Sequence, residues 1–149
     1  MAEPPSIHAS CVAIGGRGVL IRGASGAGKS ALALTLILDA PRVLEPAELV
    51  ADDRVLLAVE AGALVARPVP VLAGLIEVRG LGLRRLPHRD RVSLSLVVDL
   101  QAADAARLPP EEAQTVLISG CALPRIAPER LETAALLVAA ALSCEPYEN

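Results

Sequence analysis

The stretch GVLIRGASGAGKSALALTLILDA, from Gly18 to Ala40, decides the fold of this chain. Its first part, Gly18 to Gly23, is a short apolar run rich in branched side chains, which predicts a β-strand. Its last part, Lys29 to Ala40, has no glycine or proline and many good helix formers, which predicts an α-helix. A glycine-rich loop therefore joins a strand to a helix.

This loop, GASGAGKS, fits the pattern G-x-x-x-x-G-K-[ST]. In such loops glycines let successive backbone N–H groups wrap around phosphate oxygens, and the positive N-terminal end of the helix adds to the attraction. Lys29 would place its ammonium group at the β- and γ-phosphates, and the Ser30 hydroxyl can ligate Mg²⁺. The alternative is a glycine-rich turn that matches by chance, but the strand before it and the helix after it favour a phosphate site. We expect this site to consist of Gly23, Ala24, Ser25, Gly26, Ala27, Gly28, Lys29 and Ser30.

Lys29 is the only lysine among the 14 lysines and arginines of the chain. Arginine is a planar fork, whereas lysine is a slim point charge that fits inside a tight loop. A lysine kept at this one place indicates a site that needs the slimmer cation.

The composition limits the class of protein. The chain has 149 residues, of which 53% are hydrophobic and 21% charged, so we expect one folded domain over residues 1–149. Because Phe and Trp are absent, Leu, Val, Ala and Ile must fill the core. A net charge of -3 and the lack of base-stacking aromatic residues argue against a nucleic-acid partner.

No membrane or export segment is expected. The longest apolar uncharged run, Thr133 to Cys144, is shorter than the roughly 20 residues of a spanning helix and predicts a buried helix instead. The N-terminal stretch MAEPPSIHAS has no basic region followed by an apolar run. The three cysteines are odd in number and lack metal-type spacing, which favours a reduced protein in the cytoplasm.

The rest of the chain is rich in predicted strands. We expect strands around Asp52 and Asp53, a hairpin near Ala61-Gly62, and further elements at Leu75–Gly80 (strand), Val92–Leu100 (strand), Pro109 onward (short helix) and Pro128–Ser143 (helix). This order lacks the regular strand-helix alternation of a doubly wound sheet. It predicts an α/β P-loop core with a mixed, strand-rich sheet and flanking helices.

Two adjacent carboxylates, Asp52 and Asp53, end the stretch LVADD. After a phosphate loop such a pair suits two tasks, holding Mg²⁺ through water and taking the proton of an attacking hydroxyl. Adjacent strand residues point to opposite faces, so we expect the two carboxylates to be oriented differently. The alternative is a polar turn before the next strand.

In the stretch IEVRGLG, Glu77 and Arg79 lie two residues apart and therefore on one face of a strand. Their apolar flanks predict that both are partly buried and need partners. A carboxylate for a metal and an arginine for a phosphate would explain both residues. A structural ion pair is the alternative.

Three further features have two interpretations each. His8, in SIHAS, is a surface or capping residue unless a site recruits it, and Arg107, in AARLPPEE, is a solvated loop residue by default. A locally basic stretch forms either a solvated hairpin or a landing surface for an acidic partner protein or a phosphate. It contains Arg79, Arg84, Arg85, Arg89 and Arg91.

Together the stretches SIHAS, GVLIRGASGAGKSALAL, LVADDRVLL and GLIEVRGLG resemble, in this order, the C-terminal catalytic domain of HPr kinase/phosphorylases. The resemblance runs from Ser6 to about Glu112, with ARLPPEE as a weaker fifth stretch. It implies an HPr kinase/PEP carboxykinase-like fold. It also implies an ATP- and Mg²⁺-dependent kinase that phosphorylates a serine of the phosphocarrier protein HPr, with a reverse phosphorylase reaction, in a homo-oligomer that is commonly a hexamer.

The resemblance also implies catalytic roles. The histidine that matches His8 pairs with Asp52, which would be the general base for the serine hydroxyl and the acid in the reverse reaction. Lys29 would hold the β- and γ-phosphates. Arg107 matches, in a loose alignment, a catalytic arginine.

For the metal and the phosphates, the resemblance implies that Ser30 and Glu77 bind Mg²⁺. We expect Asp53, the second carboxylate of its pair, at the metal as well. Arg79 is expected to contact a phosphate or the substrate.

Three departures separate this chain from the family pattern. Ala31 stands where the family has Glu, LRRLPHRDR replaces the usual loop after EVRGLG, and PERL, Pro128 to Leu131, replaces PGRN, which is tied to dephosphorylation. These changes favour kinase over phosphorylase chemistry and leave two alternatives open. One is a nucleotide-binding regulatory module without turnover, and the other is a kinase with a different substrate.

Overall fold

A computed structural model describes residues 6–39 and 44–147. Its main sheet has nine strands, with the order β1-β5-β6-β9-β3-β2-β4, and β11 and then β10 lie beside the C-terminal half of β9. The strands are β1 (Ser6–Ile7), β2 (Ala9–Ile14), β3 (Arg17–Arg22), β4 (Ala47–Ala51), β5 (Val55–Glu60), β6 (Ala63–Pro68), β9 (Val92–Asp99), β10 (Thr115–Ile118) and β11 (Cys121–Ile126).

The sheet is mixed, as the sequence predicts. β9 runs parallel to β3 and to β11, whereas the other pairs of the main sheet are antiparallel. Because β3 and β9 run parallel, their carboxyl ends meet at the same edge of the sheet. The glycine-rich loop leaves the sheet at this edge.

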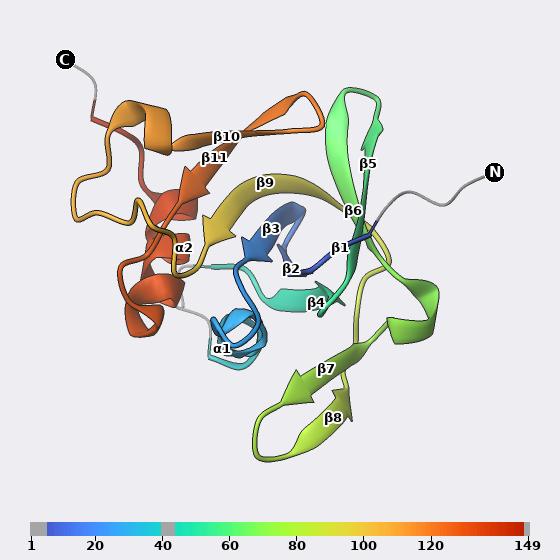
Figure 1. The fold of residues 1–149 in the computed structure, drawn as a ribbon. Coiled ribbons are helices and arrows are strands. Elements are labelled where there is room, and N and C mark those ends of the chain that lie inside the picture. Colours follow the sequence, from blue (N-terminus) through green and yellow to red (C-terminus); the bar gives the residue numbers. More distant parts are fainter. Residues whose placement is uncertain (1–5, 40–43, 148–149) are drawn as a thin grey trace.

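Two helices and a small ribbon surround this edge. Helix α1 (Lys29–Leu38) follows the loop directly, and helix α2 (Ala134–Ser143) packs beside it near the C-terminus. Strands β7 (Leu75–Val78) and β8 (Gly82–Arg85) pair only with each other and form a separate antiparallel ribbon. Figure 1 shows this ribbon and α2 on opposite sides of α1.

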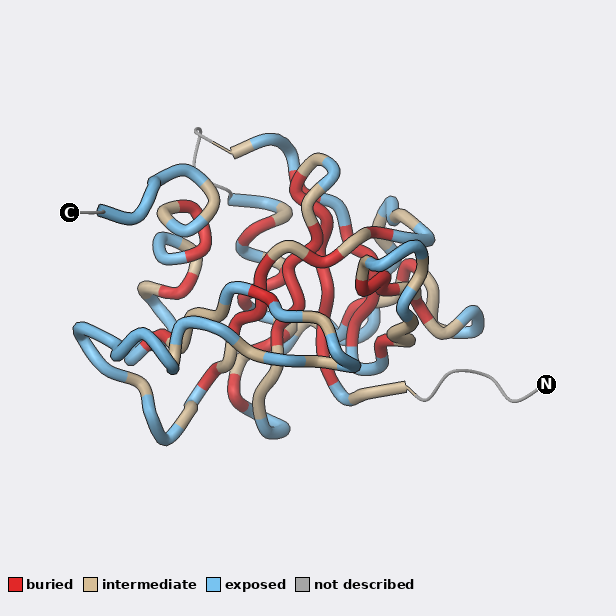
Figure 2. Tube along the Cα trace, turned by 90° about the horizontal axis from the view of Figure 1, so that it is seen from above, coloured by how far each residue is buried: buried red, intermediate tan, exposed pale blue. Residues whose placement is uncertain are grey.

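The core lies on both faces of the sheet and is built from aliphatic side chains, as the composition predicts. The side chains form two clusters, one on each face of the sheet. Along β3 successive side chains alternate between them, so Val19 and Ile21 face α1 and Leu20 faces the other side. Leu36 of α1 and Val138 of α2 complete the first cluster. In Figure 2 the buried segments gather in the middle of the sheet, and the connections around it are exposed.

Several predicted elements are confirmed, and some boundaries are wrong. The strand before the loop, the helix after it and the hairpin at Ala61-Gly62 are all present, with φ values of 50° and 80° at the turn. α1 ends at Leu38, and the predicted last residue, Ala40, lies outside the described residues. From Pro109 only a short 3-10 helix forms, Glu111–Ala113, since the chain then enters β10.

The predicted C-terminal helix is shorter and less buried than expected. Its first turn is a 3-10 helix, η3 (Leu131–Thr133), so the α-helix begins only at Ala134. α2 lies at the margin of the molecule and buries one face, which leaves Leu136 65% exposed on the other. Within the described residues no helix is both long and apolar enough to cross a membrane.

Candidate active site

The glycine-rich loop, Gly23 to Ser30, forms a tight turn over the N-terminus of α1. Gly26 and Gly28 have φ values of 85° and 103°, a region that residues with a side chain rarely adopt. A Cβ atom at Gly28 would also lie 2.5 Å from a methyl group of Leu131. These positions therefore require glycine, both for the turn and for the close approach of the C-terminal segment.

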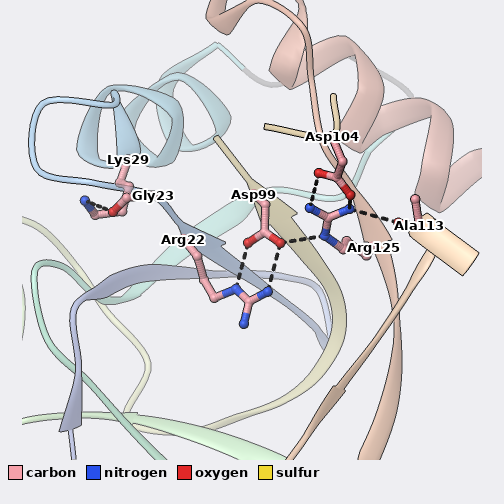
Figure 3. Close-up of polar contacts among 7 residues, drawn as sticks. All are labelled: Arg22, Gly23, Lys29, Asp99, Asp104, Ala113 and Arg125. Carbon is pink, nitrogen blue, oxygen red and sulfur yellow. Dashed lines mark hydrogen bonds and ion pairs between the residues drawn. The ribbon is translucent and has the colours of Figure 1, made fainter. Parts of the chain in front are cut away.

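Lys29 is folded back into this loop. The residue is 7% exposed, and its Nζ atom donates a hydrogen bond to the carbonyl oxygen of Gly23 at 2.8 Å (Figure 3). A second hydrogen bond reaches the carbonyl oxygen of Ala24 at 3.1 Å. Gly28, the N-cap residue of α1, provides no side-chain cap. The first N–H groups of the helix and the ammonium group thus form a compact positive site suited to phosphate oxygens.

A cavity of about 580 Å³ opens beside this loop. It is lined by the loop and the first turns of α1, by the segment around β1 and β2, by β7, and by η3. The lining residues are His8, Ser10, Ser25, Gly26, Gly28, Lys29, Ser30, Ala31, Leu34, Thr35, Asp53, Glu77, Val78, Arg79 and Leu131. Most of the residues predicted for the site are among them.

Asp52 lies beneath this cavity and is 6% exposed. Its carboxylate accepts a hydrogen bond from the hydroxyl of Ser10 at 2.6 Å. The hydroxyl of Ser30 lies 2.7 Å from Oδ1 and 2.9 Å from Oδ2 of the same carboxylate, and the backbone nitrogen of Glu77 lies 3.4 Å from Oδ2. This carboxylate is therefore fixed against the serine of the phosphate loop.

Asp53 lies at the surface, and its side chain is 64% exposed. Its Oδ1 atom is 2.7 Å from Nε2 of His8, so the pairing of His8 with Asp52 that the resemblance implied is wrong in this chain. The physical reason is that β4 already ends at Ala51, and Asp53 adopts a left-handed φ of 67°. This turn directs its carboxylate toward the link between β1 and β2, where His8 lies. The expected difference in orientation between Asp52 and Asp53 is confirmed.

Glu77 and Arg79 both line the cavity, at the end of β7 that faces it. The prediction that they are partly buried is wrong, because both are exposed. The cause is the isolation of the β7–β8 ribbon, which has no second layer over this face. Among the described residues neither forms an ion pair, so the structural alternative for these two residues loses its support.

Arg107 lies apart from the residues that the structure brings together. It is exposed in the connection between β9 and the 3-10 helix Glu111–Ala113, and it is not among the described residues that line the cavity. The basic stretch is also divided. Arg84 and Arg85 are exposed on β8, whereas Arg89 donates to the carbonyl oxygen of Gly15 and Arg91 lies 3.5 Å from Glu60.

An ion-pair network that no sequence motif indicated lies directly behind the loop. Asp99, at the end of β9, accepts two hydrogen bonds from Arg22, from Nε at 2.7 Å and from Nη2 at 2.8 Å (Figure 3). It also accepts one from Nε of Arg125 at 2.6 Å. Arg125 also donates to Asp104 at 2.9 and 3.0 Å and to the carbonyl oxygen of Ala113 at 3.0 Å. Arg22 is the residue before Gly23, so the network fixes the start of the phosphate loop. Only the register of β3 against β9, which pairs Arg22 with Asp99, could have revealed it.

The ionised carboxylate of Asp99 contributes to stability. Burial by itself would raise the pKa of this carboxyl, but the hydrogen bonds from Arg22 and Arg125 outweigh it, so the pKa is lowered. A lowered pKa means that the carboxylate stabilises the fold at neutral pH, and that this contribution is lost as the pH falls through the range below about 4.

We expect Asp99→Asn to lower the free energy of unfolding at neutral pH by about 2 kcal/mol, the value of a hydrogen bond to a charged group. In a chain of this length the melting temperature would fall by about 5 °C. The variant should also lose less stability than the parent when the pH is lowered. Thermal melts at several pH values measure both effects.

Glu60 provides the matched control. It too is a carboxylate between two arginines, Arg67 and Arg91, but it is more exposed and lies at the turn end of the β5–β6 hairpin, outside the residues that line the cavity. Glu60→Gln is expected to change the melting temperature less, since solvent screens an exposed pair. Equal acid sensitivity of Asp99→Asn and the parent would contradict the role given to Asp99.

The residues of the site also fit a magnesium ion shared with a nucleotide. Within residues 6–39 and 44–147 no three His, Cys, Asp or Glu side chains form a cluster that would hold a metal alone. Mg²⁺ is usually bound by one or two carboxylates together with substrate phosphates. The oxygen atoms of Ser30, Asp52 and Glu77 around the loop correspond to such a set.

The fold and the site define a mixed-sheet α/β domain in which a glycine-rich loop, its lysine and the exposed carboxylate of Asp53 line one cavity, with the buried carboxylate of Asp52 beneath it. The family model of the HPr Serine kinase C-terminal domain matches residues 1–118. The chain therefore belongs to the HPr serine kinase C-terminal domain family.

Individual relatives agree with this assignment. The HPr kinase/phosphorylase of Streptococcus pneumoniae (strain Hungary19A-6) is 35% identical over 137 residues, 85% of this chain and 42% of that protein. That of Streptococcus thermophilus (strain ATCC BAA-491 / LMD-9) is 45% identical over 84 residues, 56% of this chain and 25% of that protein. The chain thus spans less than half the length of these curated relatives.

A solved structure supports the fold as well. The structure of the Hpr(Ser) kinase/phosphatase from Coxiella burnetii matches this one with a TM-score of 0.73 and 26% sequence identity. The match covers 93% of this chain and 88% of that one. The predicted fold class is therefore confirmed.

Proposed function

We propose that this chain is a kinase domain that transfers the γ-phosphoryl group of ATP to a serine hydroxyl of an HPr-type protein. One observation carries the proposal. The loop with Lys29 lies in the same cavity as an exposed carboxylate, Asp53, and directly above a buried one, Asp52. A site that only bound a nucleotide would have no need of the exposed carboxylate and its histidine.

The geometry favours a division of roles between the aspartates opposite to the one expected from the sequence, in which Asp52 is the base and Asp53 lies at the metal. Asp52 is held by Ser10 and Ser30, so its carboxylate is directed at the serine that would ligate Mg²⁺. Asp53 is open to the cavity and has one partner, His8. We assign Asp52 to the magnesium side and Asp53 to the proton of the attacking hydroxyl, with His8 holding the carboxylate of Asp53 in place.

In the proposed reaction the serine oxygen of the acceptor forms a bond to the γ-phosphorus while its proton passes to Asp53. The bond between the γ-phosphorus and the bridging oxygen breaks, and ADP leaves with the electron pair. Lys29 and the loop N–H groups would stabilise the charge on the phosphates, and Arg79, which directly follows β7 and lines the same cavity, would contact them as well. Bound magnesium, with Ser30 and Glu77 as further ligands, would neutralise phosphate charge.

The assay is incubation of the chain with an HPr protein, ATP and Mg²⁺, followed by mass spectrometry for phosphoserine. We expect one phosphoserine per acceptor, none on an acceptor whose target serine is replaced by alanine, and none when Mg²⁺ is chelated. The reverse reaction, started from phosphorylated HPr, is expected to be slower, because PERL replaces PGRN at Pro128 to Leu131. ATP binding without any phosphoserine would instead support a regulatory module.

A further inference from the structure

The cavity beside the loop has two chemically different ends. Toward the end of β4 and the β7–β8 ribbon lie His8, Asp53 and Glu77, which are polar or ionisable. Toward η3 the wall consists of Ala31 and Thr35, both from α1, and Leu131, the first residue of η3. The second end has no part in the proposed transfer of the phosphoryl group.

This second wall continues into a smaller cavity of about 160 Å³. Ala31, Thr35 and Leu131 line both cavities, and Leu32, Glu132 and Ala135 line only the smaller one. The space over the phosphate loop therefore extends along α1 toward the start of α2. Cavities of several hundred cubic ångströms are typical of sites for small molecules of nucleotide size.

The surface of this extension is largely apolar. Leu131 is 42% exposed, and its methyl groups lie against Gly28 at the end of the loop. The hydroxyl of Thr35 already donates to the carbonyl oxygen of Ala31 at 2.8 Å, which leaves the methyl group of Thr35 as its free surface. Ala31 is exposed and contributes only a methyl group to the wall.

We infer that Ala31, Thr35 and Leu131 form the subsite for the nucleobase of the bound nucleotide, an inference that rests on the proposed kinase function. A nucleoside triphosphate is a chain with the transferred phosphoryl group at one end and, at the other, a flat aromatic base whose two faces are apolar. The loop fixes the phosphates between the two ends of the cavity. Because the transferred group must face Asp53, the base must lie toward the apolar wall, where it covers Leu131.

The test compares ATP with inorganic tripolyphosphate, which has the phosphates and no base. Isothermal titration of the wild-type chain should show tighter binding of ATP. Leu131→Ser is expected to weaken ATP binding about tenfold, the cost of losing one apolar side chain from the contact, and to leave tripolyphosphate binding unchanged. Leu131→Met, which keeps an apolar side chain of similar volume, should retain the affinity for ATP.

Leu136→Ser is the matched control, since Leu136 is an exposed leucine of the same C-terminal segment that lines neither cavity. It should bind both ligands as the wild type does. If Leu131→Ser weakens ATP and tripolyphosphate equally, Leu131 supports the loop and the nucleobase subsite is refuted. The same holds if Leu131→Ser binds ATP normally. A wild-type chain that binds neither ligand would overturn the proposed function itself.

Discussion

Lys29→Ala is expected to lower the rate of phosphoryl transfer at least 100- to 1000-fold, the effect of removing one preorganised charged donor from a developing negative charge. The ammonium group is held by two loop carbonyls, Gly23 and Ala24, and by burial, so it is already in place before the nucleotide arrives. No other lysine exists in the chain to replace it. Transfer of labelled phosphate from ATP to HPr measures the rate, and titration with tripolyphosphate measures the accompanying loss of affinity.

Lys29→Arg is the more informative variant. It keeps the positive charge, but a guanidinium is a planar fork and is wider than the ammonium group that the two carbonyls hold. We expect it to be nearly as inactive as Lys29→Ala. Arg91→Ala, which removes an exposed cation whose partner is Glu60, should leave the rate unchanged. An active Lys29→Arg would show that only the charge matters, and the explanation given for the single lysine would then fail.

The elements around this lysine could be predicted because their signals are local. A branched apolar run, a glycine loop and an uninterrupted helical stretch follow one another without tertiary help, and β3 and α1 form there. β2 was not predicted, although it is fully buried. Its residues, ASCVAI, are small and covered on both faces, so they show no alternation between polar and apolar positions.

The sequence predicted which residues lie at the site more accurately than it predicted their contacts. Ser30, Asp53 and Glu77 line the cavity with the loop, as expected from residue type and order. The partner of His8 depends on a single left-handed φ at Asp53, which the sequence does not specify for a non-glycine residue. The exposure of Glu77 depends on the ribbon standing away from the sheet, which is a property of the assembled fold.

Asp53→Asn is expected to lower the rate of transfer to the serine about 100- to 10,000-fold, the range for loss of a general base, with little change in the affinity for ATP. Asparagine is the suitable replacement, because it has the same shape and tolerates the left-handed φ of 67° found here. The backbone and the contact with His8 can then persist while the proton acceptor is lost. Single-turnover transfer and ATP titration separate the rate from the affinity.

Asp52→Asn is the counterpart that distinguishes the two carboxylates. Its side chain faces Ser30 and is buried, so its loss should weaken binding of ATP in the presence of Mg²⁺ more than binding without the metal. If instead Asp52→Asn abolishes transfer with unchanged magnesium dependence, and Asp53→Asn remains active, then Asp52 is the base. The hydrogen bond between His8 and Asp53 would in that case serve only to fix the bend after β4.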